Sequence, residues 1–228
     1  MPATHQVYLE VGARRVFASA LEWPGWCRSG RDEDSALQTL VDYGRRYKAA
    51  IGPAGRRFSP PKDLSALEVV ERVKGNATTD FGAPGIPPAS DDRPVDKAEG
   101  RRLTALLEVS WAAFDRTADS AVGIPLRKGP RGGGRDLDKI VGHVLHAETG
   151  YLPHIGGRYR PPKGADIADH VVEARAAVLE AMAARARGDP MPPKRGSVWS
   201  LRYFVRRDAW HVLDHAWEIE DRAEPDQS

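Results

Sequence analysis

SLRYFVRRDAWHVLDHAWEIEDRA, residues 200–223, has the strongest helical pattern in the chain. Its apolar residues recur at helical spacing, as Leu201, Phe204, Val205, Val212 and Ile219. This pattern predicts an amphipathic helix with one face in a protein core. His211 and His215 are four residues apart, so both imidazoles lie on one helix face, one turn apart, at the edge of the apolar stripe. The pair therefore points toward the interior.

Three further helices are expected upstream, separated by Gly- and Pro-rich sequence. They cover Asp96–Asp119, Asp136–Leu152 and Ala165–Arg187. Asp136 occupies an N-cap position, Pro153 ends the second helical pattern, and Gly188 closes the third. Four amphipathic helices bury their stripes most simply as an all-α, up-and-down four-helix bundle. We predict this bundle for residues 96–223, followed by a short tail at 224–228.

The first 80 residues have a mixed pattern that predicts an α+β domain. Val7–Val11 and Val16–Trp23 are rich in β-forming residues and flank a short turn, which indicates a hairpin. A helix is expected from Asp32 to Tyr47. Leu67–Val73 fits either a third strand or a short helix. Residues 81–95 are dense in Pro, Gly and Asp and are predicted to be a linker.

Composition limits the classes of partner. The chain has 228 residues, with 34 basic and 32 acidic side chains, which gives no overall electrostatic case for nucleic acid. It has no apolar run of membrane-spanning length, and Met1–Glu10 does not read as a signal peptide. Cys27 is the single cysteine, so no intramolecular disulfide can form. We expect a soluble cytoplasmic protein that acts on a small molecule; its oligomeric state stays open, a homodimer included.

The second expected helix supplies a third histidine. His143 lies beside the apolar positions of this helix and is the better inward-facing candidate, with His146 as the alternative. Three imidazoles without a fourth protein ligand make an open metal site, which is typical of catalytic rather than structural centres. Imidazole suits Zn, Ni, Fe and Cu, so the residues do not choose the metal.

Two carboxylates accompany the histidines. Glu148 falls in the middle of the apolar arc of its helix, where a carboxylate must pair, bind metal or become protonated, unless it reaches solvent at the end of the bundle. Asp208 lies one turn before His211 and could accept a hydrogen bond that fixes the tautomer of a ligand histidine. Both are candidates for proton handling.

Residues 91–222 resemble the DinB superfamily of metal-dependent four-helix proteins. The matching segments are GHVLHAE (142–148) and WHVLDHAWEIED (210–221). The family pattern has one His on the second helix, an acidic residue five positions later, and His-x3-His on the fourth helix. The resemblance implies a divalent metal, such as Zn, Ni or Fe, on His143, His211 and His215. Members with known activity are often transferases or isomerases in which the metal activates a low-molecular-weight thiol.

Residues 7–73 resemble HicB-like antitoxin domains. The matching run is VFASALEWPGWCRSGRDEDSALQTLVDYGRRY (16–47), with a strand, a Pro-Gly-x-Cys turn, a short strand and an acidic helix start. A DNA-binding segment usually follows such a domain, whereas here a linker and a bundle follow. Cys27 in this turn is interpreted as a small packed residue rather than a nucleophile.

Two functions remain in competition at this point. The first is a metal-dependent enzyme of thiol-transferase or hydrolase type, in which His143, His211 and His215 hold the ion that activates a thiol or water. Its substrate would enter at the open coordination position, bordered by the basic, Gly-rich segment Arg127–Arg135. The second is a regulatory or binding module whose first domain binds a partner and whose metal site is vestigial or structural.

Overall fold

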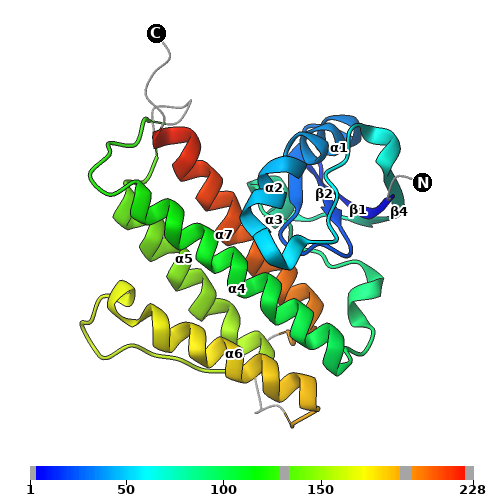
Figure 1. Ribbon diagram of the computed structural model, residues 1–228. Helices are drawn as coiled ribbons and strands as arrows, with labels where there is room; N and C mark the ends of the chain where they lie inside the picture. The colour runs from blue at the N-terminus through cyan, green and yellow to red at the C-terminus, as the bar shows by residue number, and fades with distance from the viewer. Residues whose placement is uncertain (1–3, 129–133, 191–196, 224–228) are drawn as a thin grey trace.

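The computed structural model describes residues 4–128, 134–190 and 197–223 (Figure 1). A small mixed sheet with short helices is followed by four long helices. This order confirms the predicted change from α+β to all-helical structure. The predicted tail at 224–228 and residues 129–133 of the basic segment lie outside the described residues.

The sheet has four strands in the order β3-β2-β1-β4. They are β1 His5–Val11, β2 Val16–Ala20, β3 Cys27–Gly30 and β4 Leu67–Lys74. β1 and β2 form the predicted antiparallel hairpin, and β4 pairs parallel to β1, which resolves the strand-or-helix alternative in favour of a strand. β2 ends at Ala20 rather than Trp23, because the chain turns through Trp23–Trp26 with Gly25 at a φ of 91°.

The connection from β3 to β4 contains α1 Glu33–Asp42 and α2 Gly44–Ile51. Asp32 caps α1, because its side chain accepts a hydrogen bond from the Ser35 backbone N–H. The Ser35 hydroxyl in turn accepts from the Asp32 backbone N–H, which completes a capping box. The single helix predicted here is therefore two helices, separated at Tyr43. A third short helix, α3 Ala77–Phe81, follows β4.

The four long helices are α4 Lys97–Ser120, α5 Leu137–Tyr151, α6 Val171–Arg187 and α7 Leu201–Ala223. Asp96 accepts from the Glu99 backbone N–H at the start of α4, and Gly188 ends α6 in the left-handed conformation. Asp136 is the N-cap of α5 by position, but its side chain makes no capping hydrogen bond. α6 begins later than the predicted Ala165, because residues 167–170 form a 3-10 turn.

The direction of the helices differs from the predicted up-and-down order. α4 and α7 run the same way, and α5 and α6 run the opposite way, as the colour gradient in Figure 1 shows. Arg202 near the start of α7 pairs with Glu99 near the start of α4. Gly100 near the start of α4 packs against Ala186 near the end of α6. An up-and-down bundle has short connections between consecutive helices. Residues 152–170 instead return along the bundle, so that α6 starts at the same end as α5.

The segment at 81–95 is held against both parts of the chain. The buried Glu10 of β1 accepts from the backbone N–H groups of Gly85 and Ile86 at 2.9 and 3.0 Å. Asp91 is fully buried and pairs with Arg206 of α7 at 2.8 Å. These contacts fix the segment in place, although the division into domains itself stays a prediction.

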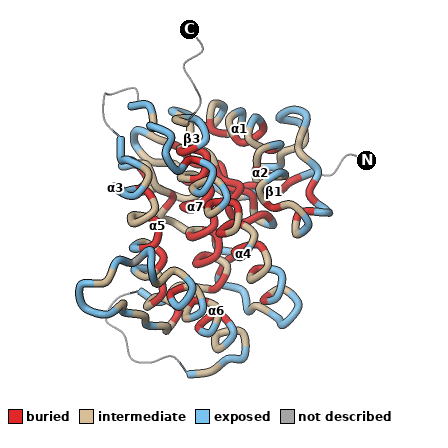
Figure 2. Tube along the Cα trace, turned by 60° about the vertical axis from the view of Figure 1, so that its left-hand side comes forward, coloured by how far each residue is buried: buried red, intermediate tan, exposed pale blue. Residues whose placement is uncertain are grey.

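One apolar core extends from the sheet into the bundle (Figure 2). α7 has the most buried residues of the four long helices and lies at its centre. Within the described residues, no helix combines the length and apolar character needed to cross a lipid bilayer.

Candidate metal centre

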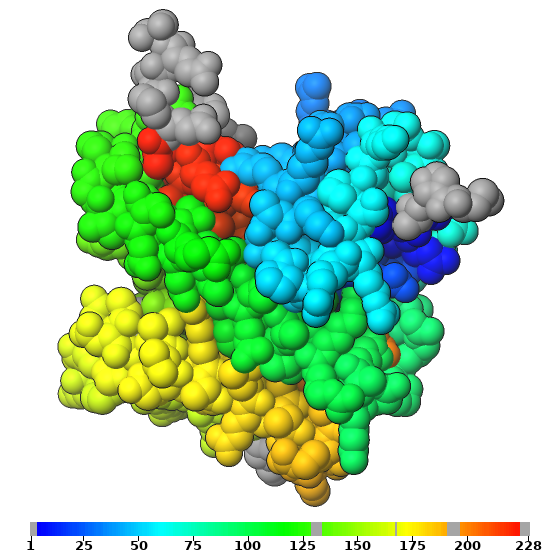
Figure 3. Space-filling model, viewed as in Figure 1, coloured from blue at the N-terminus to red at the C-terminus, as the bar shows by residue number. Residues whose placement is uncertain are grey.

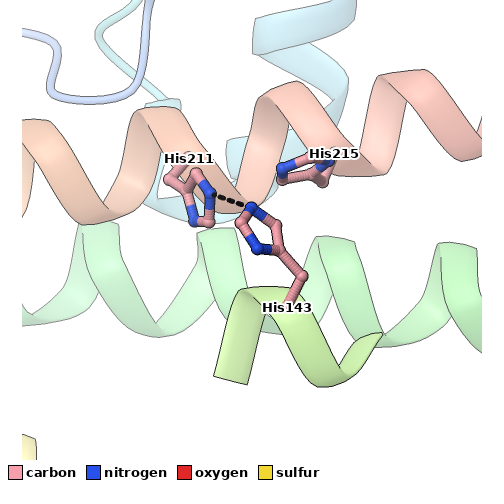
Figure 4. Close-up of side chains that lie close together, drawn as sticks. All are labelled: His143, His211 and His215. Atoms are coloured by element: carbon pink, nitrogen blue, oxygen red, sulfur yellow. Dashed lines mark hydrogen bonds between the residues drawn. The ribbon is translucent and has the colours of Figure 1, made fainter. Parts of the chain in front are cut away.

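The three predicted ligands converge between α5 and α7. His143 reaches across from α5, while His211 and His215 lie on successive turns of α7 (Figure 4). His211 is buried, and His143 and His215 are half-buried. The four-residue spacing on α7 therefore has the predicted effect, and His143 completes the group from the neighbouring helix.

The distances between the ring nitrogens suit one ion. One ligand nitrogen from each of the three rings lies within 4.8 Å of the other two. Nε2 of His143 and Nε2 of His211 are 3.2 Å apart. Two nitrogens that bind one ion at about 2.1 Å lie roughly 3.0–3.4 Å apart for angles of about 90–109° at the ion. The His143–His211 pair is thus already at ligand spacing, and His215 needs only a small side-chain movement to join it.

Glu218 orients the third ligand, a role that the sequence reasoning did not assign. Its Oε2 lies 2.7 Å from Nδ1 of His215, and Arg222 donates to its other oxygen at 2.7 Å. A proton on Nδ1 leaves the lone pair of Nε2 available for a metal, which is the usual arrangement of a carboxylate behind a ligand histidine. The three-residue spacing of these two side chains on one helix was the available signal.

The surroundings favour the neutral form of His143 and His211, which is the form that binds a metal. Burial lowers the pKa of His211 well below its ordinary value, and the neighbouring His215 and His143 lower it further. Burial also lowers the pKa of His143, with the charge of Arg135 acting in the same direction. Nδ1 of His211 is buried without a hydrogen-bond partner among the described residues.

His146, the alternative ligand, lies on another face of α5. Its side chain is exposed, and its Nδ1 contacts the backbone carbonyl of Gly142 at 2.6 Å. It does not belong to the group of residues that could share an ion. The two histidines of α5 therefore separate clearly into an inward and an outward residue.

Glu148 is almost completely buried, but it faces α6 rather than a histidine. Arg175 of α6 donates to both of its oxygens at 3.2 and 3.3 Å, and also bonds Asp115 of α4 at 2.6 Å. Burial nevertheless raises the pKa of Glu148 from 4.5 to about 6, with Arg175 opposing the shift. Of the alternatives that the sequence left open for the Glu148 carboxylate, the structure shows the ion pair.

Asp208 is fully buried, and neither of its carboxylate oxygens has a hydrogen-bond partner among the described residues. The predicted hydrogen bond from a ligand histidine is therefore not formed. Burial raises the pKa of Asp208 well above its ordinary value, and the charge of Glu148 raises it further. Both buried carboxyl groups therefore have a raised pKa and favour the protonated form more than an exposed carboxyl group does.

Cys27 lies in a different part of the molecule. It is buried, accepts a hydrogen bond from Ser19 at 2.9 Å, and packs with Phe17 and Trp210. Burial raises the pKa of its thiol to about 12. This environment is that of a packed residue, since a nucleophilic cysteine needs a lowered pKa.

Comparison of the chain with protein-family models, with curated proteins and with solved structures gives no match. The functional argument therefore stands on the three converging imidazoles and the side chains around them.

Proposed function

We propose that this protein is a metal-dependent enzyme whose centre is a single divalent transition ion on His143, His211 and His215. The observation that carries the proposal is the convergence of three imidazoles from two helices, two of them 3.2 Å apart at Nε2. The proposed resemblance of the bundle to the DinB superfamily supports the same ligand set.

The donor set favours catalysis over a purely structural role. Three histidines leave at least one coordination position open, whereas structural zinc sites are usually closed by four protein ligands. An ion held there lowers the pKa of a thiol or water and so supplies a nucleophile near neutral pH. Neutral imidazole ligands suit Zn, Ni or Fe.

The side chains of the chain have distinct roles in this proposal. Glu218 holds His215 in the tautomer that presents Nε2, and the low pKa of His211 keeps that ring unprotonated. Glu148 and Asp208 do not touch the ligands, so we assign them to proton storage and to the packing of the bundle interior.

Elemental analysis of the purified protein tests the proposal. We expect about one transition metal ion per chain, and loss of that ion in His143→Ala and His215→Ala. His146→Ala is the matched control, because it removes an exposed imidazole from the same helix as His143 and should leave the metal content unchanged. Circular dichroism of each variant shows whether the bundle is still folded.

Full metal content in His215→Ala, or equal loss in His146→Ala, would contradict the assignment. Unfolding of the bundle on chelation, rather than simple release of the ion, would make the metal structural. A metal-free preparation that binds nucleic acid in a salt-dependent manner would favour the regulatory alternative.

A further inference from the structure

The arginines of α7 differ in whether a carboxylate neutralises them. Arg202 pairs with Glu99, Arg206 with Asp91, and Arg222 with Glu218; these three bridges measure 2.5–2.8 Å. Arg207 is half-buried like two of them, yet among the described residues it makes no ion pair. A partly buried cation without a counter-charge carries a desolvation cost, and a bound anion would offset it.

The guanidinium of Arg207 is held by one backbone carbonyl and two aromatic rings. Nη1 donates to the backbone carbonyl of Pro84 at 2.7 Å, and the group lies over the rings of Trp210 at 4.9 Å and Tyr151 at 5.6 Å. A guanidinium has five N–H donors in a planar fork that matches a carboxylate. The Pro84 carbonyl uses one of these donors, and the Tyr151 side chain lies beside the group. Arg207 has no carboxylate partner among the described residues, so its other donors are available for an anionic ligand.

Arg207 lines a cavity of about 440 Å³ between α7, the end of α5 and the segment before α4. Three aromatic side chains form much of its wall, namely Tyr151, Trp199 and Tyr203. The ring of Trp199 lies 5.3 Å from that of Tyr151 and 4.7 Å from that of Tyr203. Such walls favour a flat, apolar ligand body. Asp92 also contributes to the lining but makes no ion pair with Arg207.

The cavity, called here the Arg207 cavity, adjoins the metal centre. Tyr203, Arg207, His211 and His215 follow one another at four-residue intervals on α7, so each lies on the turn next to the previous one and is rotated from it by about 40°. Tyr151 lines the cavity, and its ring lies 6.1 Å from that of His211. A ligand anchored at Arg207 would need to span one to two helical turns, on the order of 5–10 Å, to reach an ion at the histidines.

A larger cavity of about 540 Å³ lies between α2, α4 and α7, where α7 (red) reaches the surface between α4 (green) and the first part of the chain (blue) in Figure 3. Its Arg46 is already paired with Glu220 and Asp221. Its second arginine, Arg116, is exposed, so solvent stabilises that charge better than it stabilises the charge of the half-buried Arg207.

We propose that the Arg207 cavity binds a small organic acid with a flat, conjugated body, with the carboxylate on Arg207 and the body against Tyr151, Trp199 and Tyr203. Its role as the substrate site rests on the proposed metal-dependent function, since the far end of the ligand would face the histidines. Binding itself does not require the metal.

Calorimetric titration with trans-cinnamate and its neutral analogue cinnamamide tests this proposal. The full chain is titrated both after chelation and after loading with Zn²⁺. We expect the metal-free protein to bind cinnamate on the order of 10-fold or more tightly than cinnamamide, because a guanidinium forms stronger, charge-assisted hydrogen bonds with a carboxylate than with a neutral amide. The preference should weaken with salt.

Arg207→Gln should abolish the preference for the acid and leave the metal content unchanged. Arg116→Gln is the matched control, because it removes an exposed arginine of α4 outside this cavity and should bind cinnamate like the wild type. Equal binding of acid and amide by the wild type overturns the proposal even if a variant does not fold, and so does unchanged binding in folded Arg207→Gln. Metal loading without cinnamate binding refutes only this inference, whereas cinnamate binding without metal loading refutes only the metal function.

Discussion

Removing the carboxylate of Asp91 tests how firmly the segment at 81–95 joins the two parts of the chain. The Asp91 side chain accepts from Nε and Nη2 of Arg206 at 3.0 and 2.8 Å, and both residues are buried. Arg206 also donates to the backbone carbonyls of Ala20 and Leu21 at 2.6 and 3.2 Å. One guanidinium in the second turn of α7 therefore contacts both the end of β2 and the segment before α4.

Asp91→Ala leaves the Arg206 charge buried and without its counter-ion. Breaking a buried pair from one side costs about 3–5 kcal/mol, which is a large part of the about 5–15 kcal/mol that usually separates folded from unfolded states. Two backbone carbonyls still accept from the guanidinium, so we expect the lower part of this range. Urea unfolding monitored by circular dichroism measures the loss of unfolding free energy as a lower midpoint concentration of urea.

Two control variants show whether the loss of stability comes from the burial of the Asp91–Arg206 pair. Glu33→Ala breaks the exposed, bidentate pair of Glu33 with Arg72 and should have a much smaller effect, because solvent screens that pair. The double variant Asp91→Ala with Arg206→Met should be more stable than Asp91→Ala alone, since it also removes the orphaned charge. If Asp91→Ala lowers the unfolding free energy no more than Glu33→Ala does, the buried Asp91–Arg206 pair does not stabilise the fold as expected.

Two further predictions concern the bundle interior. Glu218→Gln should weaken metal binding on the order of 10–100-fold, because it removes the carboxylate that orients His215; competition with a chromophoric chelator measures this, and unchanged affinity would contradict it. The pKa of Glu148 is raised from 4.5 to about 6 by burial, so its contribution to stability is complete below pH 4.5 and is lost as the pH rises through 6. The unfolding free energy of the wild type minus that of Glu148→Gln should therefore fall by about 2 kcal/mol in total between about pH 3.5 and about pH 7. A difference that grows with pH would be inconsistent with the assignment.

Features that depend on local sequence were predicted well. The start of α4 follows from Asp96, the end of α5 from Pro153 and the end of α6 from Gly188, because caps and breakers act within one turn of the helix end. The choice of His143 over His146 followed from helical periodicity alone, and the structure has the first facing the other histidines and the second exposed.

Features that depend on distant contacts were not predicted. The direction of α6 is set by the course of residues 152–170, for which no local pattern exists. The sequence left open whether Glu148 is buried with a partner or reaches solvent, and its partner Arg175 lies on another helix and could not be named from periodicity. Asp208 has the right spacing to face His211 but makes no bond to it, because helical spacing gives the angular position of a side chain and not its partner.

The neighbouring residues Arg206 and Arg207 connect the first part of the chain to the Arg207 cavity. Consecutive residues on a helix point about 100° apart, so one guanidinium is directed at Asp91 and the other toward the Arg207 cavity. The backbone of the segment before α4 closes this cavity, because Pro84 accepts from Arg207 and Gly85 accepts from the Tyr203 hydroxyl at 2.9 Å. That backbone is in turn fixed by Glu10 of β1. The bundle supplies all three histidines, but the wall opposite Arg207 comes from residues that the sheet holds in place.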